Sequence, residues 1–232
     1  MSEWAFRPAG EGAVYLVLGE KATPAVRAEV RAAVRTVRDV LGPKLRDVVP
    51  GYASVYVEFD PEAWSLPDLR EALTGLAESP QPPIRSRLVK VPVRYGGGWG
   101  PDLGAVAEAS GLSEEEVVRR HLRPIYEVAF IGFTPGFPFL AGLDERLAIP
   151  RLAAPRRRVP RGSVGIAGLQ TGIYPVDSPG GWRIIGRTAL PLYDPRLPDP
   201  VLIRPGDRVQ FVTSTEAIPV GEFLEARPAG PR

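Results

Sequence analysis

The sequence has 232 residues, of which 44% are hydrophobic and 24% are charged, a composition typical of a folded globular chain. The formal net charge is only +2, so the charge balance disfavours nucleic acid as a partner. With no cysteine and a single histidine, His121, the chain excludes disulfides, a thiol nucleophile and a metal site built from several histidines or cysteines. No apolar run approaches the roughly 20 residues that cross a bilayer and no secretory signal is visible, so we expect a cytoplasmic protein with no membrane partner.

The pattern of residues 1–95 predicts a small α+β domain. Four apolar runs have the length and alternation of strands, and they lie at residues 13–18, 47–49, 53–59 and 86–94. Two stretches place apolar residues three or four apart, as one face of a helix requires, and they lie at residues 24–41 and 68–77. The resulting order, βαββαβ, is the split βαβ or ferredoxin-like arrangement.

The pattern of residues 96–232 predicts a second domain, a β-barrel led by two short helices. The helices are expected at residues 102–110 and 113–123. Ser113 and Glu116 match a capping box at the start of the second helix. Beyond the helices, short strands separated by glycine and proline turns indicate a barrel or a sandwich. The fold class predicted for the whole chain is therefore α+β, with two domains.

The run RVPRGSVGIAGLQTGIYPVDSPGGWRIIGRT, residues 158–188, concentrates the features of a binding site. It holds seven glycines and three prolines, which allow a ligand to approach the backbone closely and stiffen the turns in between. Polar side chains that can recognise a ligand alternate with apolar, strand-like positions. The same composition is typical of a barrel with tight turns, so the residues alone leave both interpretations open, binding site and scaffold.

His121 and Asp177 are the candidate titratable groups. His121 lies late in a predicted helix, where a packing or capping role competes with a hydrogen-bonding or general-base role at the mouth of the barrel. Asp177 has apolar and glycine neighbours that can shift the pKa of a carboxyl group. A Ser-His-Asp triad with Ser163 or Ser178 is disfavoured, because the Gly-x-Ser-x-Gly elbow is absent.

Two further features suggest an anion or a phosphate, and both have a simpler interpretation. Arg156, Arg157 and Arg158 are consecutive and can bind an anionic group, but a charge run usually faces solvent. The glycine triplet at 96–98 is not followed by Gly-Lys-Ser/Thr, so a phosphate-binding loop is disfavoured and a linker is expected.

Three stretches together resemble a known family. They are IYEVAFIGFTPGFPFLAGLDERLAIPR at 125–151, the run at 158–188, and PLYDP at 191–195 followed by RPGDRVQF at 204–211. They resemble the KipI family, also known as the B subunit of the bacterial ATP-dependent 5-oxoprolinase and formerly as allophanate hydrolase subunit 1. The resemblance covers nearly the whole chain, and the run at 158–188 is its most specific part.

The resemblance implies a fold, an activity and partners. The family's fold is a small α+β domain joined to a cyclophilin-like β-barrel. Its members work with a homologous KipA-like barrel protein and with a LamB/YcsF-type protein, and together these hydrolyse 5-oxo-L-proline to L-glutamate with ATP. This chain would then be a non-autonomous component of an enzyme that takes a small-molecule substrate, with ATP in a composite site formed with the partner proteins.

Two alternatives follow from the same resemblance. One family member inhibits a sporulation histidine kinase, so this chain could be a KipI-type inhibitor that binds a sensor histidine kinase through exposed Phe137 and Phe139. Paired barrels of the same kind form the carboxyltransferase part of urea carboxylase, so the chain could also be a carboxyltransferase half.

The resemblance also implies site residues, although it assigns no catalytic role to any of them. The expected substrate-binding positions match the family's motifs, and they are Pro135, Gly136, Phe137, Gln170, Thr171, Gly172, Tyr174, Pro179, Gly180, Gly181 and Trp182. The catalytic candidates are His121, Asp177 and Arg187, with the backbone amides of the glycine turns and Arg187 expected to hold charge that develops on oxygen. Phe139 stands where the family often has tyrosine, which removes a hydroxyl.

Overall fold

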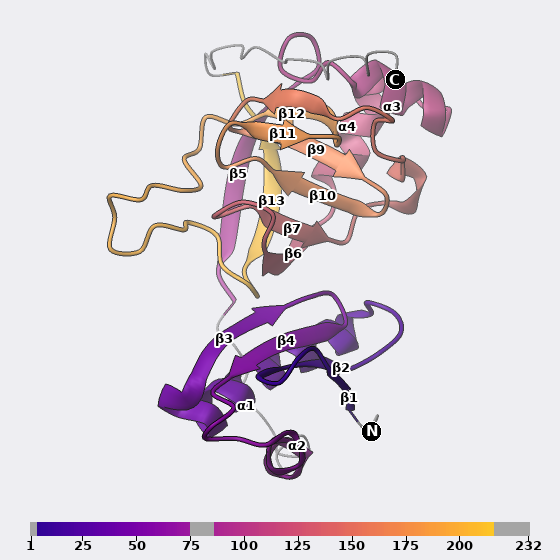
Figure 1. Ribbon diagram of the computed structural model, residues 1–232. Helices are drawn as coiled ribbons and strands as arrows, with labels where there is room; N and C mark the ends of the chain where they lie inside the picture. Colours follow the sequence, from indigo (N-terminus) through magenta and orange to yellow (C-terminus); the bar gives the residue numbers. More distant parts are fainter. Residues whose placement is uncertain (1–3, 75–85, 216–232) are drawn as a thin grey trace, which may run out of the picture. The chain divides into compact units, whose positions relative to one another are not determined.

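The first of two units, Met1–Arg85, is a four-stranded antiparallel sheet that packs against two helices (Figure 1). The computed structural model describes residues 4–74 and 86–215. The elements of this unit are β1 Ala5–Pro8, β2 Ala13–Val17, α1 Pro24–Leu41, the 3₁₀ turn Gly42–Lys44, β3 Leu45–Pro50, β4 Ser54–Phe59 and α2 Leu66–Thr74. The expected helix at 68–77 is confirmed as far as Thr74, and its remainder lies outside the described residues.

Helix α1 shows how the local sequence sets the boundaries of this unit. The Thr23 hydroxyl accepts a hydrogen bond from the Val26 amide at 3.2 Å, which caps one of the free amides at the start of the helix. Proline follows at the first helical position, where its missing amide costs nothing. The helix ends at Leu41 and is capped by Gly42, whose φ is +49°. The apolar stripe of α1 packs on the sheet and supplies part of the first core.

The strand order of this unit corrects the predicted βαββαβ arrangement. The sheet runs β1-β2-β4-β3. One of its two edge strands, β1, was not predicted, and it pairs with β2 from Ala5 opposite Val17. The predicted last strand, Leu88–Tyr95, is β5 of the second unit. The division between the units therefore falls at Arg85 and Ser86 instead of at the expected residues 95 and 96. The alternation of a strand fixes which face is buried, but it does not say which sheet the strand joins.

The second unit, Ser86–Arg232, contains a closed seven-stranded β-barrel. The barrel strands are β5 Leu88–Tyr95, β6 Tyr126–Ile131, β7 Pro138–Ala141, β9 Ser163–Ala167, β10 Gln170–Ile173, β12 Arg183–Arg187 and β13 Arg208–Thr213. Around the barrel they follow the order β10-β7-β6-β13-β5-β12-β9, and β13 runs parallel to β5 while the other neighbouring pairs are antiparallel. A short two-stranded sheet joins β8 Arg156–Val159 to β11 Ser178–Gly180. Of the two predicted architectures, barrel and sandwich, the structure has the barrel.

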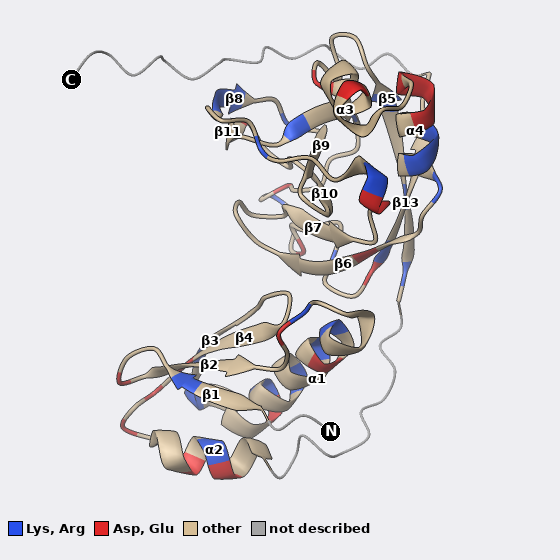
Figure 2. Cartoon of the chain, turned by 90° about the vertical axis from the view of Figure 1, so that its right-hand side faces the viewer, with Lys and Arg blue, Asp and Glu red and all other residues tan. Residues whose placement is uncertain are grey.

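Helices α3 Leu103–Ser110 and α4 Glu114–Leu122 lie between β5 and β6, as predicted. The Ser113 hydroxyl accepts the Glu116 amide at 3.2 Å, but the Glu116 carboxylate pairs with Arg120, so only half of the predicted capping box forms. Figure 2 shows the acidic first turn of α4 and its basic last turn, a distribution that complements the helix dipole. A 3₁₀ turn, Glu145–Leu147, follows β7.

The barrel encloses the larger of two apolar clusters in this unit. Strands β5, β6 and β13 contribute to it, and α3 and α4 cover it with Leu103, Val106 and Val117. A second, mainly aromatic cluster lies around Phe137, Tyr174 and Trp182. The helices among the described residues are too short or too polar to cross a membrane.

Candidate functional site

His121 lies at the end of α4 with its ring fully buried in the barrel core. Its Nδ1 atom is 2.9 Å from the Tyr95 hydroxyl, and its Nε2 atom is 2.9 Å from the Thr171 hydroxyl. The ring also lies 4.5 Å, centroid to centroid, from Phe211. A side chain from a helix thus ties together strands β5 and β10.

The hydrogen bonds around His121 fix its tautomer. The Thr171 hydroxyl donates to the Gly165 carbonyl oxygen at 2.9 Å, so it accepts from His121 Nε2–H, and Nδ1 accepts from the Tyr95 hydroxyl. Burial lowers the pKa of His121 to about 3, which leaves the ring neutral near pH 7. With both nitrogens occupied inside the core, His121 holds the barrel together, and of the two predicted roles the structure supports packing.

The aromatic cluster accounts for three of the expected substrate-binding residues. Phe137 and Tyr174 have no exposed surface and Trp182 is 5% exposed, and burial raises the pKa of Tyr174 to about 12. Phe137 contacts both of the other rings edge-on, with centroids 5.1 and 5.3 Å away. These side chains pack against one another, and Phe137 and Tyr174 have no exposed surface to offer a ligand.

Two of the expected glycines make room for this cluster. A Cβ atom at Gly172 would lie 2.8 Å from the ring of Phe137, and one at Gly180 would lie 2.2 Å from the hydroxyl of Tyr174. Both distances are far below a carbon contact, so only glycine fits. Of the remaining expected residues, Gln170 opens β10 and Pro179 lies in β11, while the Gly181 carbonyl accepts the Leu152 amide at 2.7 Å.

The turn between β6 and β7 is held by three backbone hydrogen bonds, one of which joins the Gly132 amide to the Phe137 carbonyl at 3.1 Å. The Phe137 amide donates to the Thr134 carbonyl at 3.0 Å, with Pro135 and Gly136 (φ +81°) in the two central positions of a type II turn. The Thr134 amide donates to the Gly132 carbonyl at 2.7 Å, which holds Phe133 at φ +64°, a conformation unusual for a bulky residue. Phe133 is 62% exposed.

This turn borders a cavity of about 280 Å³, which we call the arginine cavity. Its lining residues are Arg161, Gly162, Pro175, Arg187, Thr188, Ala189, Leu190, Pro191 and Tyr193. The Cα of Gly136 packs so closely that a Cβ there would lie 3.1 Å from the Cβ of Tyr193 and 3.6 Å from that of Pro175. Residues of the segments 158–188 and 191–195 therefore line this cavity together, and Gly136 of the segment 125–151 packs against two of them.

Gly162 forms the tightest backbone crossing in the cavity wall. Its amide donates to the Tyr174 carbonyl at 2.6 Å, and its own carbonyl accepts the Thr188 amide at 2.9 Å. Its φ is +81°, and a Cβ atom would lie 2.1 Å from the Thr188 carbonyl oxygen. Any other residue would force these two segments apart.

Of the catalytic candidates, Arg187 lines the arginine cavity and Asp177 lies beside it. Arg187 is 8% exposed, and its Nε donates to the Arg161 carbonyl at 2.8 Å. Asp177 Oδ2 accepts from Arg158 Nη2 at 2.6 Å, and Oδ1 accepts the Arg161 amide at 2.7 Å. Partial burial of Asp177 works to raise its pKa, but the Arg161 amide and Arg158 outweigh it and leave the pKa lowered. Asp177 is thus an ionised, paired carboxylate with no proton to give at neutral pH.

The three consecutive arginines have separate environments. Arg156 is buried, and its two terminal nitrogens donate to Asp102 at 2.7 and 2.9 Å. Arg157 is exposed, and Arg158 is exposed and bound to Asp177. The prediction of a solvated loop was therefore wrong for Arg156, since Asp102 lies inside the fold at the start of α3 and needs a buried partner.

Sequence reasoning named only Arg187 among the residues that line the cavity as a candidate. Most of the others lie in the stretches quoted for the resemblance, Ala189 and Leu190 fall between two of them, and neither Arg161 nor Tyr193 was singled out. Only the three-dimensional structure identifies these two residues, because Arg161 comes from the turn before β9 and Tyr193 from the segment after β12.

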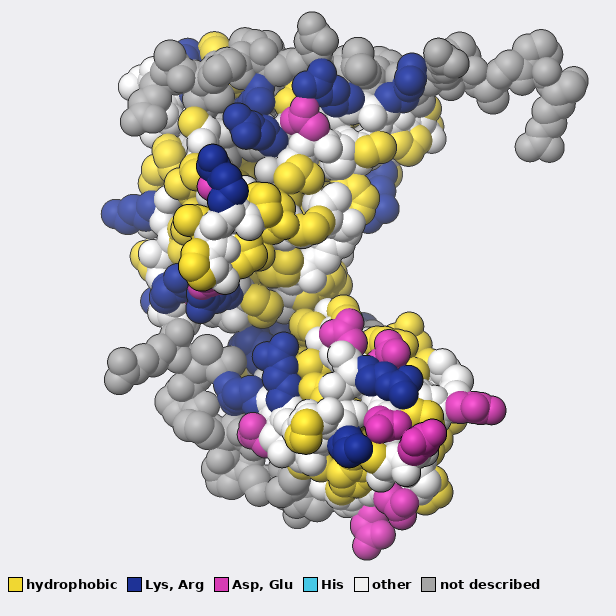
Figure 3. Space-filling model, turned by 60° about the vertical axis from the view of Figure 1, so that its left-hand side comes forward, with side chains coloured by type: hydrophobic (Ala, Val, Ile, Leu, Met, Phe, Trp, Pro, Cys, Tyr) yellow, Lys and Arg dark blue, Asp and Glu magenta, His cyan; other side chains and the backbone are white. Residues whose placement is uncertain are grey.

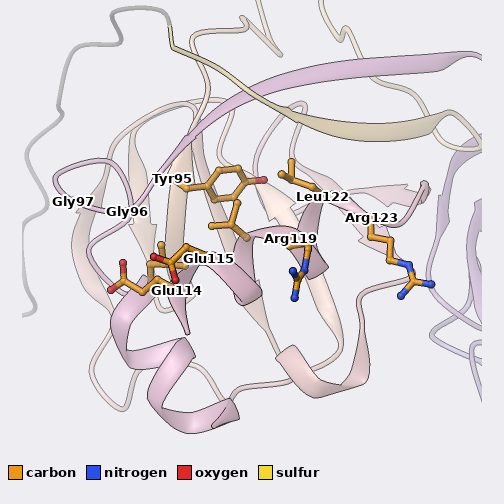
Figure 4. Close-up of a pocket in the computed structure, with 10 residues that line it drawn as sticks. Tyr95, Gly96, Gly97, Glu114, Glu115, Arg119, Leu122 and Arg123 are labelled. Atoms are coloured by element: carbon orange, nitrogen blue, oxygen red, sulfur yellow. The ribbon is translucent and has the colours of Figure 1, made fainter. Parts of the chain in front are cut away.

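A larger groove, of about 650 Å³, lies over α4 on the same unit. It is lined by Tyr95, Gly96, Gly97, Leu103 and residues of α4. Figure 4 shows Glu114 and Glu115 at one end of this groove and Arg123 at the other. None of the expected site residues lines it, so we place the candidate site at the smaller arginine cavity, where the family stretches meet.

No metal centre is present in the part of the chain that the structure describes, because no three His, Asp or Glu side chains there are placed to hold an ion. The glycine loop after β5 also lacks the form of a phosphate-binding loop. The Gly96 amide donates to the Ile185 carbonyl at 3.0 Å, and the Trp99 and Gly100 amides donate to the Gly96 carbonyl at 3.1 and 3.0 Å. These three amides donate to the chain's own carbonyl groups, so they are not available to hold a phosphate.

Comparison with known proteins identifies the family. Residues 4–203 match the family model "Carboxyltransferase domain, subdomain C and D". The chain belongs to this carboxyltransferase-domain family. Within it, the chain is 41% identical to the 5-oxoprolinase B subunit of Bacillus subtilis, over 89% of this chain and 91% of that protein. It is 43% identical to the 5-oxoprolinase B subunit of Escherichia coli O157:H7, over 90% and 95% of the two chains, which confirms the resemblance seen in the sequence.

Solved structures of related proteins share the fold. The protein TTHA0988 superposes with a TM-score of 0.78 at 41% identity, over 95% of this chain. The chain spans only 43% of TTHA0988. Urea carboxylase of Kluyveromyces lactis superposes with a TM-score of 0.75 at 21% identity, over 90% of this chain and 22% of that chain, and this likeness concerns the fold alone.

Proposed function

We propose that this chain is the B subunit of an ATP-dependent 5-oxoprolinase, which hydrolyses 5-oxo-L-proline to L-glutamate together with a KipA-like partner and a LamB/YcsF-type partner. The observation that carries the proposal is that two of the stretches that resemble the family, 158–188 and 191–195, line the arginine cavity together, in a chain whose relatives are named as this component. The chain would be a hydrolase component acting on a cyclic amide.

The site supports the role of a component because it holds only part of a catalytic set. His121 is neutral and buried with both ring nitrogens hydrogen-bonded, and Asp177 is ionised with a lowered pKa, so it has no proton to donate and is a weak base. What the cavity offers is positive charge from Arg161 and Arg187. Proton transfer and the second half of the site would come from the partner proteins.

In this proposal ATP hydrolysis would drive the opening of the lactam ring. Three amides of the glycine loop after β5 donate to the chain's own carbonyl groups, which supports a location of ATP outside this loop. We therefore place ATP on the partner proteins or in a composite site with them. The amides of Gly162, Thr188 and Leu190 donate within the chain, so of the groups expected to hold charge developing on oxygen, Arg187 is retained and these amides are not.

Reconstitution from purified components tests the proposal. The KipA-like and LamB/YcsF-type partners are assayed for glutamate formation from 5-oxo-L-proline and ATP, with this chain present, absent and added back. Turnover is expected only when the chain is present, and full turnover in its absence would overturn the proposal. The variant Arg183→Gln serves as a control, since Arg183 lies on β12 outside the cavity and its Nε donates to the Pro150 carbonyl.

A carboxyltransferase half is the second candidate, favoured by the description of the matching family. It predicts biotin-dependent transfer of a carboxyl group when a biotin carrier and a barrel partner are supplied. The same preparation distinguishes the two candidates, because 5-oxoproline-dependent ATP hydrolysis without biotin belongs to the first candidate alone.

The two residues expected to anchor a histidine kinase, Phe137 and Phe139, are not exposed in the structure. Phe137 is completely buried and Phe139 is partly buried against Phe130. The barrel unit does expose apolar side chains, as the face in Figure 3 shows, and Phe133 is the most exposed large one among the described residues. Nothing in the geometry of this surface selects a kinase over another protein.

A further inference from the structure

The groove over α4 has an apolar middle between two ends of opposite charge. Its volume is about 650 Å³, and its apolar lining residues are Tyr95, Leu103, Val118 and Leu122. Figure 4 shows Tyr95 and Leu122 between the two ends, of which one holds two glutamates of α4 and the other holds Arg123. A peptide with apolar side chains and a charged end matches such a groove, because apolar contact supplies affinity and charge fixes the direction.

Helix α4 has one face against the barrel and another toward the groove. Val117 and His121 are fully buried against the barrel core. Val118 and Leu122, each one position further along the chain, are only partly buried. They lie four residues apart, so both are on the same face of the helix. This face therefore keeps apolar surface that the described part of the chain does not cover.

Arg123 supplies the positive charge at the basic end of the groove. The other arginine that lines the groove, Arg119, is paired with Glu116 of the same helix. Arg123 follows α4 and is exposed. A segment that brings acidic side chains to this end is therefore favoured over a neutral or a basic one.

The described chain ends beside this groove. Strand β13 runs parallel to β5 with Thr213 opposite Val93, and the Ser214 amide donates to the Val93 carbonyl at 2.9 Å. Tyr95, two residues beyond Val93, lines the groove. Because the two strands run in the same direction, the chain leaves the barrel at Thr215 next to the groove.

The segment that follows, residues 216–225, has a composition that matches the groove. Its sequence is EAIPVGEFLE, with apolar Ile218, Val220, Phe223 and Leu224 and with Glu222 and Glu225 near its end. An extended chain covers about 3.3–3.6 Å per residue, so ten residues reach about 33–36 Å. The nine residues of α4 rise only about 14 Å. The segment is therefore long enough to run along the whole helix.

Attachment to the same chain favours this segment over an occupant from outside. A segment tethered close to its site has an effective concentration of the order of millimolar. A second copy of the chain, or another protein, has to bind at its own concentration. A contact too weak to join two molecules is therefore sufficient within one chain.

We propose that residues 216–225 bind in the groove over α4 of the same chain, with their apolar side chains against Val118 and Leu122 and their acidic side chains beside Arg123. The segment fastens the end of the last barrel strand to α4. Another protein can use the groove only by displacing it. This inference goes beyond the proposed function and does not depend on it, because its test needs only the isolated chain.

Labelling of a single thiol in the groove tests the proposal, since the natural chain has no cysteine. Full-length Val118→Cys is treated with a soluble thiol reagent, with and without the added substitutions Phe223→Ser/Leu224→Ser. A segment bound for about nine-tenths of the time slows the reaction about tenfold, so the added substitutions should raise the rate about tenfold. Glu114→Cys, an exposed position that lines the groove, replaces Val118→Cys if that variant does not fold.

Two controls are matched to this measurement. Leu197→Cys places the thiol at an exposed position outside the groove lining, and its labelling rate should be the same with or without the substitutions in the segment. Ala229→Ser/Pro231→Ser changes two residues beyond the proposed segment and should leave Val118→Cys slow to react. Thermal melting shows that each variant is folded at the temperature of the assay.

Charge reversal tests the position of the acidic residues. In Val118→Cys at low salt, Arg123→Glu and the pair Glu222→Arg/Glu225→Arg should each raise the labelling rate by up to about fivefold, the range of an exposed ion pair. Combining the two changes should restore slow labelling. Labelling that becomes faster still in the combined variant overturns the placement of these glutamates beside Arg123.

The remaining outcomes decide what occupies the groove. Equal labelling of Val118→Cys with and without Phe223→Ser/Leu224→Ser overturns the proposal. Protection that is lost on dilution of the protein assigns the groove to a second copy of the chain. Protection that appears only when a KipA-like or LamB/YcsF-type protein is added assigns the groove to that protein. Both of these results also overturn binding of the segment.

Discussion

Two ion pairs on the same short strand differ in almost every physical respect. Arg156 and Arg158 lie two residues apart on β8. The Asp102–Arg156 pair is buried, with its side chains 8% and 7% exposed, and it has two parallel hydrogen bonds. The Asp177–Arg158 pair has side chains 41% and 44% exposed, and both bonds from Arg158 go to one oxygen.

The difference shows what each pair does. Asp102 also accepts the Ile184 amide at 2.7 Å and precedes α3, so the buried pair joins a helix, β8 and β12 in one arrangement. Asp177 accepts the Arg161 amide beside the arginine cavity, so the exposed pair adjusts the charge next to the candidate site. The same residue types thus serve the fold in one place and the site in the other.

The largest effect is expected when the buried pair loses its acidic residue. Asp102→Ala leaves Arg156 buried without its carboxylate, and we expect it to lower the free energy of unfolding by about 3–5 kcal/mol. Urea unfolding measures the change. The double variant Asp102→Ala/Arg156→Met should recover most of the loss, because no charge is then left buried. A loss below about 1 kcal/mol would show that the buried pair contributes no more to stability than an exposed ion pair.

His121 extends the comparison to a buried group without charge. Its pKa is about 3 in the folded chain and 6.5 ordinarily, so between these values the unfolded chain binds a proton that the folded chain does not. Stability is therefore complete above pH 6.5 and falls as the pH drops toward 3, by about 1.4 kcal/mol per pH unit. The free energy of unfolding is measured from pH 7 to pH 4. Its slope against pH should be smaller in His121→Gln than in the natural chain, by about 1.4 kcal/mol per pH unit.

Tyr95→Phe is the matched control for His121. It removes the hydroxyl that donates to Nδ1 but keeps the buried ring that titrates, so its pH profile should run parallel to that of the natural chain. Acidic groups with lowered pKa, such as Asp177, are common to all three proteins and cancel in the comparison. Parallel profiles for the natural chain and His121→Gln would contradict the assignment of a neutral histidine.

Phe133 differs from both pairs, because its side chain is exposed while its backbone is strained by a positive φ. The left-handed backbone at Phe133 costs about 1–2 kcal/mol for a residue with a Cβ and little for glycine. Phe133→Gly and Phe133→Ala both remove the ring, so the difference between them reports the backbone. We expect the glycine variant to be more stable by about 1–2 kcal/mol in thermal or urea unfolding. An alanine variant of equal stability would rule out this strain.

The smallest effect belongs to the exposed pair. Asp177→Ala should lower the free energy of unfolding by only about 0.2–1 kcal/mol at low salt. Raising the ionic strength to about 1 M screens exposed charges, so this loss should shrink, while the loss in Asp102→Ala should persist. A salt-independent loss at Asp177 would show that the pair acts as a buried one.

Most strands and helices were predictable from the local sequence pattern, but the pairing of the strands was not. The stripe of α1 and the capping serine of α4 lie in the sequence itself. The assignment of Leu88–Tyr95 to the wrong sheet shows the limit, because its parallel partner, Arg208–Thr213, lies more than a hundred residues later. The edge strand Ala5–Pro8 was missed because it is four residues long and mostly exposed.

The site was predictable as a region but not as a set of contacts. Resemblance indicated the right segments and named Arg187, which lines the cavity. It could not distinguish residues that face a ligand from those that support the wall, so the buried Phe137 and Tyr174 were placed with the binding residues. His121 was a catalytic candidate because it is the single histidine. Its burial could not be predicted, because it depends on strands and a helix that come from distant parts of the chain.

The parallel pairing of β5 with β13 has a consequence for how the protein is made. The strand that opens the barrel has, as one of its two neighbours, the strand that ends it. During synthesis, one edge of Leu88–Tyr95 must therefore wait until Thr213 has left the ribosome before the wall can close. Folding of the second unit is then a late event that depends on a distant contact, which is slow by nature. A nascent chain stalled before Arg208 would present an open sheet edge, the form in which strands most readily pair with a neighbouring molecule.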